Sequence, residues 1–236
     1  MIKKTFFALS MAVVMMFVSA TVLCLRALNA PQAVFGSENS SMKIVLDAGH
    51  GGIDGGVVGK TTKAKESDVN LAITMRLKDT LADMGFEVTL TRKTEAGLYG
   101  TTAKGFKKRD MQKRKEIIER ADPDLVISIH QNYYPSASSR GAQVFYKKSD
   151  EKGEQFAKAL QNKLNALYAE EGVKQRNAMA GEYFMLSCTP SPSVIIECGF
   201  LSSALDEALL IDAAWQRQLS EAIAAGAVAY LAEGLS

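Results

Sequence analysis

The chain has 236 residues, and its 28 lysines and arginines against 26 aspartates and glutamates give a formal net charge of +2. This length is enough for one core of ordinary size but too short for two full domains plus a leader. The near-balanced charge, with no basic stripe interleaved with aromatic residues, argues against nucleic acid as a partner.

The first segment, residues 1–30, is an apolar leader. Lys3 and Lys4 precede an apolar run over 5–25, which only Ser and Thr interrupt. A positive segment before such a run directs export, and the run is close to the roughly 20 residues that span a bilayer. We therefore expect a signal-anchor that leaves the lysines in the cytoplasm and the rest of the chain outside. Cleavage at 27–30 is the alternative and gives a secreted, extracytoplasmic protein.

Small and polar residues over 31–41 favour a linker, so that 42–236 forms one domain. Strand-like and helix-like segments then alternate in chain order: a strand at 43–47, a helix carrying Val69 to Leu81 and ending at Gly85, a strand at 86–90, a helix at 109–121, strands at 125–129 and 142–146, a helix at 151–171, a strand at 193–196 and a last helix around Trp215 to Tyr230. This alternation predicts a single α/β domain with a mostly parallel sheet and helices on both faces.

Cysteines are too few to predict a disulfide framework. Cys24 lies in the leader, which leaves Cys188 and Cys198. These two either pair in an oxidising compartment or remain as two buried thiols, and we prefer the second interpretation because no repeated cysteine spacing demands a bridge.

The chain has only two histidines, and each follows a strand-like run. His50 lies in DAGHGG after the first strand, and His130 lies in SIHQN after the third. A histidine in a loop is more often solvated or part of a core. However, ligands of parallel α/β sheets bind at the carboxyl ends of the strands, so two histidines in matching positions favour one shared site.

A zinc site for hydrolysis needs three protein ligands and one open position. Glu66, at the start of a predicted helix close after His50, is the candidate third ligand, although acids in a first turn are common for electrostatic reasons alone. Glu197 ends a buried apolar strand, where an acid is costly unless it is paired or functional, so it is the candidate general base. With both histidines assigned to metal, none remains to activate a serine.

The four stretches that carry these residues are DAGHGGIDG at 47–55, KES at 65–67, SIHQN at 128–132 and IIECGFLS at 195–202. Together they resemble the zinc-dependent N-acetylmuramoyl-L-alanine amidases (amidase type 3). The resemblance implies one Zn²⁺ bound by His50, Glu66 and His130, with Glu197 as catalytic acid and base. It also implies a mixed sheet of about six strands, and peptidoglycan as the substrate, cut between the N-acetylmuramoyl residue and L-alanine.

The RGAQVFY stretch at 140–146 is similar to the short, membrane-anchored, germination-specific amidases of endospore-forming bacteria. That resemblance implies a role in spore cortex maturation and leaves room for a regulatory protein partner, which the sequence does not identify. Two alternatives remain open: a zinc peptidase or carboxypeptidase that acts on wall peptides, and a non-catalytic wall-binding protein. Analysis of the products separates the first, and zinc content separates the second.

Two further segments are candidates for substrate contact. The Gly-rich, basic stretch at 97–108 is expected to form a loop at the rim, whose lysines either meet acidic stem peptides or are simply solvated. Tyr133 and Tyr134 follow the second histidine and either pack against the substrate or close the edge of the core.

Overall fold

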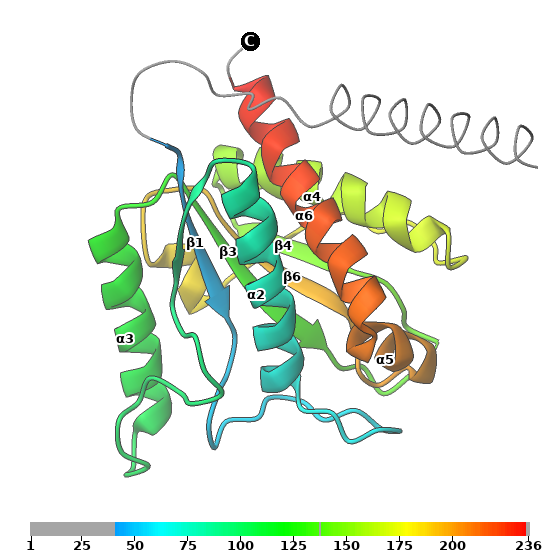
Figure 1. Ribbon diagram of the computed structural model, residues 1–236, viewed down its shortest axis with the longest axis horizontal. Coiled ribbons are helices and arrows are strands. Elements are labelled where there is room, and N and C mark those ends of the chain that lie inside the picture. The colour runs from blue at the N-terminus through cyan, green and yellow to red at the C-terminus, as the bar shows by residue number, and fades with distance from the viewer. Residues whose placement is uncertain (1–40, 137, 235–236) are drawn as a thin grey trace, which may run out of the picture. The chain divides into compact units, whose positions relative to one another are not determined.

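A mixed sheet organises residues 41–136 and 138–234, the parts of the chain that the computed structural model describes (Figure 1). Its strands are β1 (Lys43–Ala48), β2 (Glu87–Leu90), β3 (Leu125–Asn132), β4 (Gln143–Lys147), β5 (Met179–Gly181) and β6 (Ser193–Phe200). The six described strands lie in the order β2-β1-β3-β6-β4-β5, and every neighbouring pair is parallel except β4 and β6. The predicted mixed, mostly parallel sheet of about six strands is confirmed.

Helices cover both faces of this sheet, as the sequence predicts. They are α2 (Glu66–Asp83), α3 (Phe106–Ala121), α4 (Glu151–Ala169), the 3₁₀ helix η1 (Phe184–Ser187), α5 (Ala204–Ile211) and α6 (Ala213–Glu233). Successive strand residues point to opposite faces: Ile44 and Leu46 of β1 join the core under α2, α4 and α6, whereas Val45 joins a second cluster with Ile118 of α3. The second face is therefore covered by α3 and η1.

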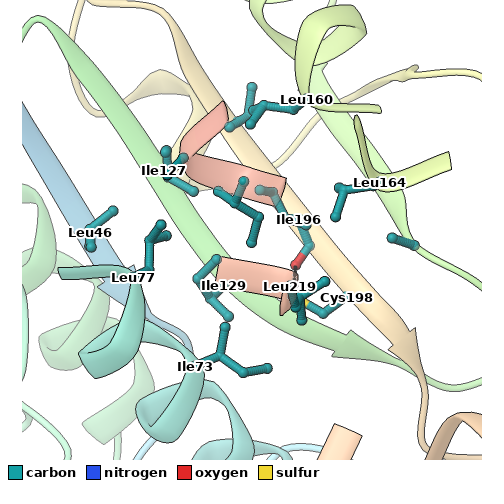
Figure 2. Close-up of a cluster of buried hydrophobic side chains, with 14 of the residues drawn as sticks. Leu46, Ile73, Leu77, Ile127, Ile129, Leu160, Leu164, Ile196, Cys198 and Leu219 are labelled. Atoms are coloured by element: carbon teal, nitrogen blue, oxygen red, sulfur yellow. Dashed lines mark hydrogen bonds between the residues drawn. The ribbon is translucent and has the colours of Figure 1, made fainter. Parts of the chain in front are cut away.

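The larger core lies between the sheet and the helices α2, α4 and α6. Figure 2 shows Ile73 and Leu77 of α2 close to the strand residues Ile127 and Ile129, all of them fully buried. At Gly226 of α6, an added Cβ would lie 2.8 Å from the backbone of α4, so glycine there lets the two helices approach closely.

Several elements differ from the sequence prediction in extent. Helix α3 begins at Phe106 rather than at residue 109, and α4 ends at Ala169 rather than at 171. The short β5, η1 and α5 are not predicted. His130 and Glu197 lie inside β3 and β6 rather than after them, because backbone pairing continues past the apolar run that defines the predicted strand.

The predicted signal-anchor at 1–30 lies outside the described residues, as does the predicted linker apart from Ser41. No helix within the described residues combines the length and the apolar character that a membrane crossing requires. Cys188 and Cys198 are both buried and free, as expected for two buried thiols.

Candidate metal centre

His50 lies on a loop whose backbone carbonyl groups accept hydrogen bonds from two buried arginines. It follows the end of β1 and adopts a left-handed backbone conformation with φ 61°, which is unusual for a residue with a side chain. Arg114 of α3 donates to the carbonyl oxygens of Ala48 (2.8 Å) and His50 (2.6 Å). Arg92, which follows β2, donates to the carbonyl oxygens of Ala48 (2.8 Å) and Gly49 (3.0 Å). These contacts fix the loop in the conformation that presents the His50 ring.

The charge of Arg114 is balanced inside the protein. Its guanidinium donates to Asp47 (2.5 Å) and Asp110 (2.6 Å), and Asp47 also accepts hydrogen bonds from the hydroxyls of Thr91 and Ser128. Burial raises the pKa of Asp47, but Arg114 and the two hydroxyls outweigh burial and lower this pKa from 3.8 to about 2. Asp47 therefore stays ionised beneath the site.

Glu66 is the first residue of α2, and its carboxylate lies between the two histidines. Oε1 is 3.2 Å from His50 Nε2 and 3.0 Å from His130 Nδ1, while Oε2 accepts a hydrogen bond from the backbone N–H of Val57 (2.9 Å). Burial alone raises the pKa of Glu66, but hydrogen bonds and Coulombic attraction from the two histidines hold it well below its usual range. Glu66 is thus an anion at any physiological pH.

His130 packs directly over Gly49. A Cβ added to Gly49 would lie 2.2 Å from Cε1 of the His130 ring, so glycine at that position is a steric requirement for the ring. In the sheet, His130 pairs in register with Glu197 of the neighbouring strand. Strand pairing therefore brings together two residues that are distant along the chain.

A further carboxylate orients His50 from the other side. Asp54 Oδ1 lies 3.2 Å from His50 Nδ1, and Lys107 Nζ lies 3.4 Å from Asp54 Oδ2. Because Nδ1 faces Asp54, Nε2 is left to face Glu66 and His130, the arrangement found where a carboxylate orients a metal-binding histidine.

The three candidate ligands form a group that could hold a metal ion. One ligand atom from each of His50, Glu66 and His130 lies within 4.8 Å of the others. Tetrahedral zinc with bonds of about 2.0–2.1 Å separates its ligand atoms by about 3.3 Å, close to the two distances measured from Glu66 Oε1 (3.0 and 3.2 Å). Geometry and donor chemistry both fit such an ion.

Glu197 lies beside this group and is held differently from Glu66. Its Oε2 is buried and has no hydrogen-bond partner among the described residues. Burial raises the pKa of Glu197 from 4.5 to about 7, with His130 and His50 opposing and Glu66 adding to the rise. A carboxyl group with such a pKa exchanges protons near neutral pH.

Three residues that support this group are not predicted from the sequence: Asp54, Arg92 and Arg114. Asp54 lies in the DAGHGGIDG stretch at 47–55, so the sequence motif around His50 already contains it. Neither arginine carries a sequence signal, because each looks like an ordinary charged residue until the fold buries it.

Three comparisons with known proteins bear on this site. The family model described as N-acetylmuramoyl-L-alanine amidase matches residues 44–229. The germination-specific N-acetylmuramoyl-L-alanine amidase of Bacillus subtilis (strain 168) is 35% identical over 193 residues, covering 80% of this chain and 80% of that protein.

Solved structures agree with this likeness. The CwlD amidase from Clostridioides difficile, solved in complex with the GerS lipoprotein, has a TM-score of 0.78 and 34% sequence identity, covering 82% of this chain and 100% of that chain. The catalytic domain of CwlV, an N-acetylmuramoyl-L-alanine amidase from Bacillus (Paenibacillus) polymyxa var. colistinus, has a TM-score of 0.69 and 29% identity, covering 81% and 98% of the two chains.

An α/β fold that brings a His/Glu/His group, which could hold a metal ion, beside a protonatable carboxyl group is typical of hydrolases. Within that class, the chain belongs to the N-acetylmuramoyl-L-alanine amidase family. It hydrolyses the amide bond that joins the N-acetylmuramoyl residue to the L-alanine of the stem peptide in peptidoglycan.

Proposed function

We propose that this amidase is zinc-dependent, with Zn²⁺ bound by His50, Glu66 and His130 and with Glu197 as the residue that moves protons. The observation that carries the proposal is the convergence of the three ligand atoms within 4.8 Å. The buried and unpartnered Oε2 of Glu197 beside them supports the second role.

The chemistry divides between the ion and the protein. His50, Glu66 and His130 would hold the zinc ion, which would supply Lewis-acid chemistry for a carbonyl group and would lower the pKa of bound water to about 7. Glu197 accepts the proton of the attacking water at Oε2 and returns it to the alanine nitrogen as the amide C–N bond breaks. Asp54 keeps His50 in the orientation that leaves Nε2 free, and Glu66 contributes a fixed negative charge.

The relatives and the leader support a biological setting for this activity. We propose that the chain acts outside the cytoplasm on spore cortex peptidoglycan, tethered by residues 1–30, because the Bacillus subtilis relative is germination-specific and the leader has the composition of an anchor. The Clostridioides difficile relative forms a complex with a lipoprotein, which supports a protein partner for this chain as well.

Digestion of purified cortex peptidoglycan tests this proposal. The full chain with zinc is expected to release stem peptides with a free L-alanine amino group and to leave muramic acid without peptide. A chelator is expected to abolish the release, and zinc to restore it. Shortened peptides in place of intact stems would indicate a peptidase, and a chain that binds wall without stoichiometric zinc would indicate a wall-binding protein.

A further inference from the structure

Two hollows of different chemistry meet at the candidate metal centre. The first, which we call the apolar pocket, has a volume of about 290 Å³ and is lined mainly by Tyr99, Phe106, Met111, Tyr183, Phe184 and Met185. The second, the polar pocket, has a volume of about 420 Å³ and is lined by Gln131, Asn132, Tyr133 and Glu197, among others.

Both pockets include His50, Asp54, Lys107 and His130 in their linings. The metal-binding histidines are therefore the boundary between the two hollows. A substrate whose reacting bond lies at the histidines can extend one part into each hollow.

The apolar pocket lies on the sheet face that α3 and η1 cover. Tyr183 and Phe184 are 45% and 48% exposed, whereas Met185 and Ile195 are each only 5% exposed. Exposed rings at the entrance of a pocket with a buried apolar lining offer a surface for a ligand with apolar faces.

The charges around the apolar pocket are already paired. Arg114 is bound to Asp47 and Asp110, and Lys107 is bound to Asp54. A carboxylate placed in the pocket would meet three aspartates and no unpaired cation among the described residues that line it, and an uncompensated charge in an apolar site is costly.

The polar pocket contains the carboxyl groups of Asp54, Glu66 and Glu197, so it differs from the apolar pocket in its amide groups and not in its charge. Gln131 has a buried Oε1 without a partner among the described residues, and Asn132 presents a side-chain amide. Lys60 is not among the residues that line this pocket, but its Nζ lies 5.5 Å from the centre of the ring of Tyr133, which does line it. Amides in the pocket and an ammonium group beside it suit a peptide that carries carboxylates.

One half of the proposed substrate has apolar faces and the other is rich in amides, as the two pockets are. The muramoyl half is an uncharged sugar ring with apolar C–H faces and an acetamido methyl group, whereas the stem peptide is acidic and rich in amides. Resting on the proposed function, we infer that the muramoyl sugar binds in the apolar pocket against Tyr183 and Phe184, and that the stem peptide binds in the polar pocket within reach of Asn132 and Lys60. This assignment fixes the direction in which the substrate crosses the metal centre.

Separate binding of a probe for each half tests the assignment. The probes are the uncharged disaccharide N,N′-diacetylchitobiose, which has the acetamido-sugar rings without the lactyl carboxylate, and the dipeptide L-alanyl-γ-D-glutamate, titrated by NMR into the zinc-loaded full chain. Phe184→Ala is expected to weaken disaccharide binding at least tenfold and to change dipeptide binding less than twofold. Lys60→Ala is expected to weaken dipeptide binding about threefold and to leave disaccharide binding unchanged.

Leu205→Ala is the matched control, because Leu205 is an apolar residue, 62% exposed on α5, that lines neither pocket. Both Kd values are expected to stay at the wild-type level. Should Phe184→Ala unfold, Tyr183→Leu takes its place with the same expectation.

The outcomes separate this inference from the proposed function. If Phe184→Ala weakens dipeptide binding instead, or changes neither Kd, the assignment of the pockets is wrong while wild-type hydrolysis of peptidoglycan remains. If the wild-type chain with zinc releases no stem peptide from peptidoglycan, the proposed function itself fails, whatever the two probes show.

Discussion

Glu66 and Glu197 lie beside the same two histidines, but their pKa values are shifted in opposite directions. Glu66 is held as an anion by His50 and His130, so its pKa lies well below the usual range. Glu197 has no partner for Oε2, and burial raises its pKa to about 7. Neighbouring acids with pKa values moved apart in this way take different roles in catalysis: Glu66 is suited to bind a cation and Glu197 to transfer protons.

Glu197→Gln tests the second role. The substitution keeps the size of the side chain but removes the proton acceptor, so the rate of amide hydrolysis is expected to fall by about 10²–10⁴-fold. Zinc content is expected to stay at one per chain. The release of L-alanine amino groups measures the rate, with Glu87→Gln, an exposed glutamate on β2, as control. Near-wild-type turnover in Glu197→Gln would remove Glu197 from the mechanism.

Asp54→Asn tests how His50 is oriented. The loss of the carboxylate 3.2 Å from Nδ1 is expected to lower zinc affinity about 10–100-fold. Unfolding stability is expected to change little, because Asp54 is partly exposed. Competition with a chromophoric chelator measures the affinity, and Asp68→Asn, an exposed aspartate in the first turn of α2, serves as control. Equal affinities in the two variants would contradict the orienting role.

At the scale of elements, the site is assembled by contacts that cross from one element to another. Figure 1 shows the first turns of α2 and α3 at the end of the sheet to which β1 and β3 point. Arg114 of α3 binds the loop after β1, and Arg92 binds both that loop and the carbonyl oxygen of Ser67 in α2 (2.7 Å). These hydrogen bonds connect α3, the loop after β1 and the start of α2 next to the candidate ligands.

Arg114→Met tests this connection. The variant leaves Asp47 and Asp110 buried without their cation, and the free energy of unfolding is expected to fall by about 3–5 kcal/mol. Denaturant unfolding of zinc-free protein measures the loss, and Lys113→Met, an exposed cation on the same helix, is the control. A loss below about 1 kcal/mol would show that the ion pairs beneath the loop contribute little.

Acid denaturation tests the same network through Asp47. Its pKa is lower in the folded chain (about 2) than the ordinary 3.8, so the ionised group stabilises the fold above about pH 4 and this contribution disappears as pH falls towards 2. The shift corresponds to about 2.5 kcal/mol. Urea unfolding of wild type and Asp47→Asn is therefore expected to differ most near neutral pH and to converge in acid. A difference that does not depend on pH would contradict the lowered pKa.

For the molecule as a whole, the sequence predicts the class of fold and the candidate site residues better than the residues that support the site. The α/β class follows from alternating runs of strand and helix. His50, His130 and Glu197 attract notice because their residue types have few other reasons to stand at the ends of predicted buried strands, and Glu66 because it begins a predicted helix close after His50. The support from Arg92 and Arg114 could not be predicted, since it depends on contacts with residues 25 to 67 positions away in the chain.

The short elements were missed for a different reason. β5 is an exposed edge strand of three residues and η1 is a single 3₁₀ turn, so neither leaves a periodic pattern in the sequence. Yet η1 supplies Phe184 and Met185 to the apolar pocket. The features that set substrate orientation therefore lie in the part of the fold with the weakest sequence signal.

Three side chains from separate parts of the fold are proposed to bind one zinc ion. Anomalous diffraction at the zinc edge, from crystals of the zinc-loaded chain, tests this binding. One strong peak per chain is expected, about 2.0–2.2 Å from His50 Nε2, Glu66 Oε1 and His130 Nδ1. A peak bound elsewhere, or no peak between these three atoms at saturating zinc, would contradict it.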